Sequence, residues 1–136
     1  MEMGKSWMLP IDKTYSLVTQ LEGVEELKQA ASGKQGIILL APHLSNWEIF
    51  GMYACQNIVS TFMYQPPKLP ALDRLLQRTR SRGGMKLAPA DRKGVSLLLK
   101  ALQRGEMVGV LPDQVPNDEG GVFANFFGKQ ALTMTL

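Results

Sequence analysis

Cysteine and histidine are almost absent from this 136-residue chain, which contains one of each, Cys55 and His43. A single cysteine excludes an internal disulfide framework and is typical of a reducing compartment. Because there is no Cys-x-x-Cys pair and only one histidine, we expect no metal site, and nothing indicates a cofactor. Cys55 falls inside an expected helix with no second histidine to activate it, so we interpret it as a buried, unreactive thiol.

Long apolar segments and several common functional motifs are also missing. The longest apolar run, residues 36–42, is far shorter than the roughly 20 residues that cross a bilayer, and no signal-peptide pattern is visible. We therefore expect a soluble or membrane-associated chain. There is no G-x-S-x-G elbow, P-loop or G-x-G-x-x-G motif. Aromatic residues make up only 7% of the chain and are scattered, which argues against nucleic acid as a partner.

Positive charge is present but concentrated in one stretch. The net charge is +3, yet residues 68–93 contain eight Lys and Arg against two Asp, so the rest of the chain is net negative. Such a stretch attracts phosphates, acidic lipid head groups, nucleic acid or an acidic protein. A solvated helix face explains the same charges, and composition alone leaves both interpretations open.

Short apolar runs alternate with helical stretches, a pattern that predicts an α/β fold with a mostly parallel sheet. Residues 36–40, GIILL, predict a fully buried strand. Ser45 and Glu48 predict a capping box that opens a helix. Strands are expected at 16–20, 36–40, 58–64, 85–88 and 107–111, and helices at 23–31, 45–56, 71–82 and 94–104.

The ends of the chain carry weaker patterns. Residues 1–15 are expected to form a lead-in segment, and residues 16–136 a partial domain. After Pro112 we expect a loop up to residues 120–121, followed by a cluster of phenylalanines. Residues 131–136 look like the start of an element without a cap or turn, which predicts that the chain is a fragment of a longer protein.

His43 is the first candidate for chemistry, because it follows the clearest strand and precedes a helix. Open α/β folds bind their ligands at this carboxyl edge of the sheet. Glu48 lies five residues later. If His43 is in the loop, its imidazole can fold over the first helical turn, and Glu48 could orient one ring nitrogen so that the other acts as a base. A structural histidine and a purely capping Glu48 are the alternatives.

Five blocks of the sequence resemble the late acyltransferases of lipid A biosynthesis, the lauroyl and myristoyl transferases. The first, Gly36–Glu48, contains the family's H-x4-D/E motif. A lone H-x4-E is a weak signal, but the five blocks keep the family's order and spacing. The other four are Tyr64–Lys68 (YQPPK), Arg80–Arg82 (RSR), Gly109–Gln114 (ending in PDQ) and Gly121–Gly128 with Ala131–Thr133, a phenylalanine-rich loop.

The resemblance implies a glycerolipid-acyltransferase-like α/β sandwich at the cytoplasmic face of the bacterial inner membrane. It implies an acyl-acyl carrier protein donor and, as acceptor, a hydroxyl on a lipid A precursor. His43 would then be the general base and Glu48 the residue that orients it. The chain departs from the family at Gln65, where relatives have arginine, and in being about half the family's length.

The family also suggests supporting residues. Arg80 and, less directly, Arg82 would contact substrate phosphate or developing negative charge, with a solvated helix face as the alternative. Asp113 follows a strand end and could hydrogen-bond the loop around His43, or simply form a turn. The phenylalanines at 123, 126 and 127 would line an acyl groove, contact a membrane or pack in a core.

Three functional hypotheses follow. The first is transfer of an acyl group to a lipid A precursor. The second keeps the same catalytic pair but uses another glycolipid or an aminolipid as acceptor. The third is an inactive remnant that binds lipid or carrier protein.

Overall fold

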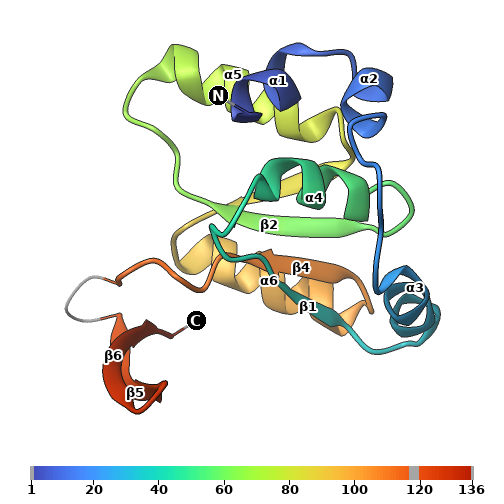
Figure 1. The fold of residues 1–136 in the computed structure, drawn as a ribbon. Coiled ribbons are helices and arrows are strands. Elements are labelled where there is room, and N and C mark those ends of the chain that lie inside the picture. Colours follow the sequence, from blue (N-terminus) through green and yellow to red (C-terminus); the bar gives the residue numbers. More distant parts are fainter. Residues whose placement is uncertain (1, 117–119, 136) are drawn as a thin grey trace.

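The computed structural model describes residues 2–116 and 120–135 (Figure 1). Helices and strands alternate through most of the described chain, and two strands end it. In chain order the elements are α1 (Glu2–Met8), α2 (Ile11–Tyr15), α3 (Val24–Ser32), β1 (Ile37–Leu40), α4 (Trp47–Ala54), β2 (Ser60–Tyr64), α5 (Pro70–Ser81), β3 (Met85–Pro89), α6 (Arg92–Gln103), β4 (Met107–Val110), β5 (Gly121–Phe126) and β6 (Lys129–Met134).

Four parallel strands form the central sheet, in the order β1-β4-β2-β3. The last of these strands along the chain, β4, therefore lies between β1 and β2. Because parallel strands end at the same edge of a sheet, the loops that follow β1 and β4 emerge side by side. The predicted α/β fold with a parallel sheet is confirmed, and its strand order decides which distant residues can meet.

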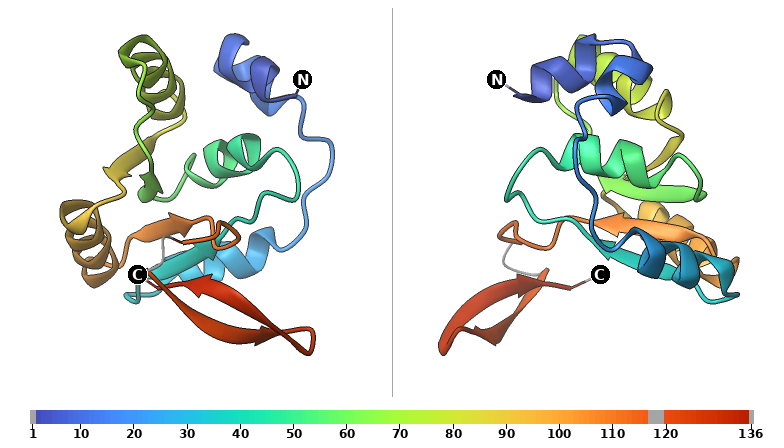
Figure 2. Two further views of the ribbon diagram at one scale, coloured as in Figure 1. Left: turned by 90° about the vertical axis from the view of Figure 1, so that its left-hand side faces the viewer. Right: turned by 45° about the vertical axis from the view of Figure 1, so that its right-hand side comes forward.

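Helices cover the sheet from both sides (Figures 1 and 2). On one face α6 packs on β2, β3 and β4; the buried residues there are Ala88, Leu98, Ala101 and Val108. On the other face Phe62 and Met85 form a second cluster with Cys55, which follows α4. The sheet is thus the middle layer of a three-layer arrangement.

The second cluster depends on a close approach between β4 and β2. A Cβ atom at Gly109 would lie 2.1 Å from Cε1 of Phe62, well inside van der Waals contact. Glycine at this position therefore makes room for the fully buried Phe62 ring.

Residues 2–15 contain α1 and α2, which pack beside α4 and α5. Ser6 and Thr14 are fully buried there. Tyr15 Oη donates a hydrogen bond to the Met52 carbonyl at 3.3 Å. None of the helices in the part of the chain that the structure describes is long and apolar enough to span a membrane.

Two predicted local structures are wrong. Residues 16–20 form a turn and an extended segment instead of a strand, because the Ser16, Leu17 and Val18 amides bond to carbonyls of α2. The capping box is also absent: Asn46 is the N-cap of α4 and makes no side-chain capping bond.

The predicted strand at 36–40 exists, but it is not fully buried. Ile38 and Leu40 are exposed, because β1 is an edge strand and α6 packs over its neighbours instead.

The phenylalanine-rich stretch is not a loop. Residues 121–126 and 129–134 pair as an antiparallel hairpin of β5 and β6, which stands apart from the sheet in Figures 1 and 2. Residues 117–119 of the expected loop and Leu136 lie outside the described residues.

Candidate active site

His43 and Asp113 meet at the carboxyl edge of the sheet, 70 residues apart in sequence. Asp113 Oδ2 accepts a hydrogen bond from the His43 amide at 2.6 Å, and Oδ1 lies 2.9 Å from His43 Nδ1. The contact follows from the strand order, since His43 is in the loop after β1 and Asp113 in the loop after the adjacent β4. The suggested hydrogen bond between the His43 loop and Asp113 is thus present in the structure, with the His43 amide as donor.

This geometry assigns different tasks to the two ring nitrogens of His43. A carboxylate only accepts hydrogen bonds, so Nδ1 carries the proton and donates it to Asp113. Nε2 then has a lone pair that can accept a proton. The hydrogen bonds from the His43 side chain and backbone lower the pKa of Asp113 below 3.8, which keeps the carboxylate ionised at neutral pH.

Glu48 has a different partner from the one expected. Its carboxylate is fully buried and receives hydrogen bonds from Arg80: Nη2 to Oε1 at 2.6 Å, and Nε to both oxygens at 3.2 Å. Glu48 therefore pairs with Arg80, and the prediction that it orients His43 directly is wrong. Glu48 points from the first turn of α4 toward α5, where burial of a carboxylate requires a cation.

Trp47 contacts a member of each hydrogen-bonded pair, Arg80 and His43. The Arg80 guanidinium carbon lies 4.9 Å from the Trp47 ring centroid. The indole also makes an edge contact with the His43 ring, with centroids 6.1 Å apart. Sequence reasoning did not select Trp47, although an aromatic residue between the histidine and glutamate of the H-x4-E block was the available signal.

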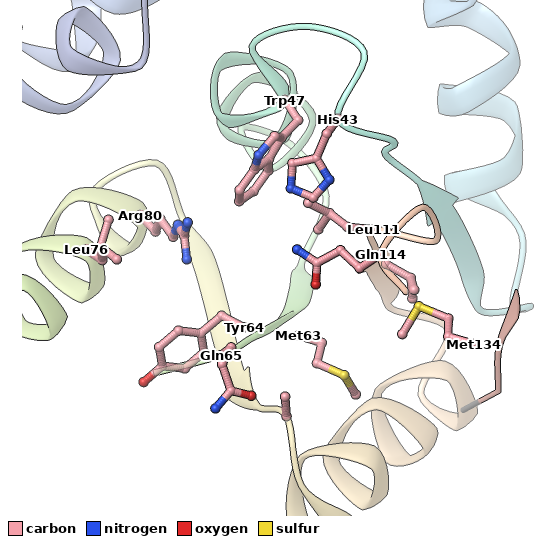
Figure 3. A pocket seen from close by; sticks show the side chains of 12 residues that line it. His43, Trp47, Met63, Tyr64, Gln65, Leu76, Arg80, Leu111, Gln114 and Met134 are labelled. Carbon is pink, nitrogen blue, oxygen red and sulfur yellow. The ribbon is translucent and has the colours of Figure 1, made fainter. Parts of the chain in front are cut away.

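A cleft of about 350 Å³ lies in front of these residues (Figure 3). His43 and Trp47 stand on one side of it, and Arg80 comes from α5 on another. Its lining is completed by Met63, Tyr64, Gln65, Leu76, Ala90, Val110, Leu111, Gln114 and Met134. Polar groups that converge on a partly apolar cleft are typical of a small-molecule or lipid site.

The two candidate arginines have different surroundings. Arg80 is 8% exposed and lines the cleft, so it does not belong to a solvated helix face. Its hydrogen bonds to Glu48 use Nε and Nη2, so Nη1 takes no part in this pair. Arg82 is exposed and is not part of the cleft lining; its Nη2 donates to the Ser6 carbonyl and so ties α5 to α1.

Of the remaining candidates, Gln65 lines the cleft and the others do not. Cys55 is buried, and burial raises the pKa of its thiol, as expected of an unreactive cysteine. Phe123, Phe126 and Phe127 are exposed on the hairpin and do not line the cleft. Gln65, the departure from the family pattern, does line it.

All 136 residues match the model of one protein family, described as bacterial lipid A biosynthesis acyltransferase. The chain belongs to this acyltransferase family. The lipid A biosynthesis acyltransferase of Haemophilus influenzae is 35% identical over 115 residues, which are 82% of this chain and 35% of that protein.

Two Escherichia coli members of the family match along nearly the whole chain. The lipid A biosynthesis lauroyltransferase is 29% identical, over 99% of this chain and 44% of its own length. The lipid A biosynthesis palmitoleoyltransferase is 28% identical, over 98% and 43%. The chain therefore spans less than half the length of these acyltransferases.

Proposed function

We propose that this chain carries the catalytic portion of an enzyme that transfers a fatty acyl group from acyl-acyl carrier protein to a hydroxyl of a lipid A precursor. The observation that carries the proposal is the hydrogen-bonded pair of His43 and Asp113 at the edge of a cleft, opposite a buried arginine. Membership of the acyltransferase family supports the reaction class.

His43 acts as the general base in this proposal. An alcohol has a pKa far above 7, so it attacks a thioester slowly unless a base removes its proton. Nε2 accepts the hydroxyl proton while the oxygen attacks the thioester carbon. Asp113 holds Nδ1 and stabilises the imidazolium that forms. When the carbon–sulfur bond breaks, the thiolate takes the proton from Nε2, and the products are an ester and the free carrier thiol.

Arg80 is the proposed electrostatic partner of this step. Its guanidinium can face either the negative oxygen of the tetrahedral intermediate or a phosphate of the acceptor. Glu48 then supports catalysis by holding Arg80, and Trp47 by separating Arg80 from His43. Arg82 contributes positive charge near the end of α5, which favours a phosphorylated lipid.

The acceptor determines where the proposed reaction takes place. An acceptor anchored in lipid requires the cleft to lie at a membrane surface, which we propose is the cytoplasmic face of the bacterial inner membrane. The excess positive charge of residues 68–93 complements both anionic lipid and an acidic carrier protein.

A direct assay tests the proposal. The purified chain is supplied with acyl-acyl carrier protein and a lipid A precursor, and its rate is compared with that of His43→Ala. We expect the substitution to lower the rate by about 10²–10⁴. Equal rates in the two proteins would refute the catalytic role of His43. Parallel assays with other hydroxylated glycolipids and aminolipids test the choice of acceptor.

A further inference from the structure

The hairpin of β5 and β6 exposes apolar side chains in an arrangement that the proposed chemistry does not use. Phe123 and Leu132 are opposite each other on one face, whereas Val122 and Phe126 belong to the other face. Val122, Phe123 and Phe126 are all exposed. The hairpin is therefore apolar on both faces.

The tip of the hairpin is also apolar, although its backbone conformation is unfavourable for a phenylalanine. Phe127 and Gly128 form the two-residue turn with φ values of 48° and 77°. Such turns favour Asn-Gly, because a bulky side chain is disfavoured at positive φ. Yet Phe127 is 93% exposed and contacts Phe126 edge to face, with ring centroids 4.6 Å apart. The strained position therefore presents a phenylalanine pair at the end of the hairpin.

The charge and the position of the hairpin indicate which surface the pair of Phe126 and Phe127 contacts. Residues 120–135 contain no acidic residue, and their one charged side chain, Lys129, is paired with Phe126. A lysine beside an aromatic tip can reach lipid phosphates while the rings enter the acyl boundary. At the other end of the hairpin, Met134 lines the catalytic cleft (Figure 3), so the hairpin connects the cleft to its own tip.

We propose that the tip of this hairpin, Phe126 and Phe127 with Lys129, inserts into the surface of an anionic lipid bilayer and so holds the cleft at the membrane. The inference rests on the proposed function, since a lipid-linked acceptor places the reaction at a bilayer. Insertion is shallow, because the outer edges of a two-stranded hairpin carry unpaired backbone groups that the hydrocarbon core excludes.

Binding to vesicles of phosphatidylglycerol and phosphatidylethanolamine tests the proposal. We expect Phe127→Asp to lower the partition of the chain into sedimented vesicles about tenfold or more, because it replaces an inserted ring by a charge. Lys129→Gln should weaken binding about fivefold, and only where phosphatidylglycerol is present. Val59→Asp is the matched control: Val59 is also exposed, but it precedes β2 at the opposite edge of the sheet.

A second readout locates the tip directly. Phe127→Trp should show a shift of tryptophan emission to shorter wavelength when vesicles are added, beyond any change in the parent chain. Unchanged emission, or vesicle binding by Phe127→Asp equal to that of the parent chain, would overturn the proposal. Loss of a dimer in sedimentation, without loss of vesicle binding, would also overturn it and would assign the tip to a second copy of the chain.

Acyl transfer to a detergent-dispersed acceptor separates this proposal from the proposed function. Phe127→Asp should retain the parental rate there, since Phe127 does not line the cleft. If neither protein transfers acyl groups but vesicle binding still depends on Phe127, the proposed function fails and the membrane contact stands.

Discussion

Asp113 controls which nitrogen of His43 is available to a substrate. The Asp113→Asn substitution keeps the shape of the side chain but removes its charge and offers an amide that can bond either form of the ring. We expect kcat to fall by about 10²–10⁴ with little change in KM, because substrate contacts are untouched. Steady-state kinetics check this, and a parental kcat would contradict the assigned role.

The same pair makes stability depend on pH in a predictable direction. The pKa of Asp113 is lowered in the folded chain by its hydrogen bonds to His43. Its contribution to stability is therefore complete above the ordinary value of 3.8 and is lost as the pH falls through the lower, folded pKa. Urea unfolding of the parent and Asp113→Asn chains should differ at neutral pH and converge in acid. A constant difference would contradict the linkage.

The buried pair of Glu48 and Arg80 should be costly to break from one side. Arg80→Met leaves the Glu48 carboxylate buried without its cation, which is expected to destabilise the fold by about 3–5 kcal/mol. In the double variant Glu48→Leu/Arg80→Met neither charge remains, so much of this loss should be recovered. Urea unfolding of both single variants and the double variant measures the coupling.

An exposed ion pair provides the control for this comparison of single and double variants. Lys28 and Glu25 lie 2.7 Å apart on α3 but are both largely exposed, so Lys28→Met should change stability little. Additive effects of the Glu48 and Arg80 substitutions would contradict the buried pairing.

At the scale of elements, the contact between β4 and β2 is tightly packed at Gly109. Gly109→Ala forces a methyl group into the Phe62 ring and should destabilise the fold by about 1–3 kcal/mol. Gly4→Ala is the matched control: nothing lies within 4 Å of an added Cβ in α1, and alanine favours a helix. A lower denaturant midpoint for Gly4→Ala than for Gly109→Ala would contradict this packing.

Elements that depend on local pattern were predictable from the sequence. The apolar runs of β1 and β4 and the helical stretches of α3, α5 and α6 appear close to their expected bounds. The exposure of Ile38 was not predictable, because the position of β1 at the sheet edge is decided by strand order. The turn at residues 127–128 was missed because Phe-Gly is an unusual pair for a two-residue hairpin turn.

The parts of the candidate site that depend on local sequence pattern were also predictable. His43 could be placed after a strand, and its loop could be linked to Asp113, because both follow apolar strands. The partner of Glu48 could not be found, since Arg80 is 32 residues away on another helix. Local spacing instead suggested a capping box with Ser45, which the structure does not form.

At the scale of the whole molecule, the basic stretch should act through long-range attraction. Arg74 and Arg78 are exposed on α5, where they would attract the acidic carrier protein of the proposed reaction. Arg74→Glu/Arg78→Glu should raise KM for acyl-acyl carrier protein several-fold at low salt, leave kcat unchanged and lose its effect at high salt. Lys100→Glu on α6 is the control: Lys100 is exposed but lies outside residues 68–93, so this variant should leave KM near the parental value.

The proposed mechanism requires that His43 hold its proton on Nδ1 and offer Nε2 to the substrate. Because His43 is the only histidine, a long-range ¹H–¹⁵N spectrum of the imidazole recorded at alkaline pH reports this one ring without assignment. We expect a neutral ring protonated at Nδ1 in the parent chain, and a shift toward Nε2 protonation in Asp113→Asn. A parent ring protonated at Nε2 would contradict it.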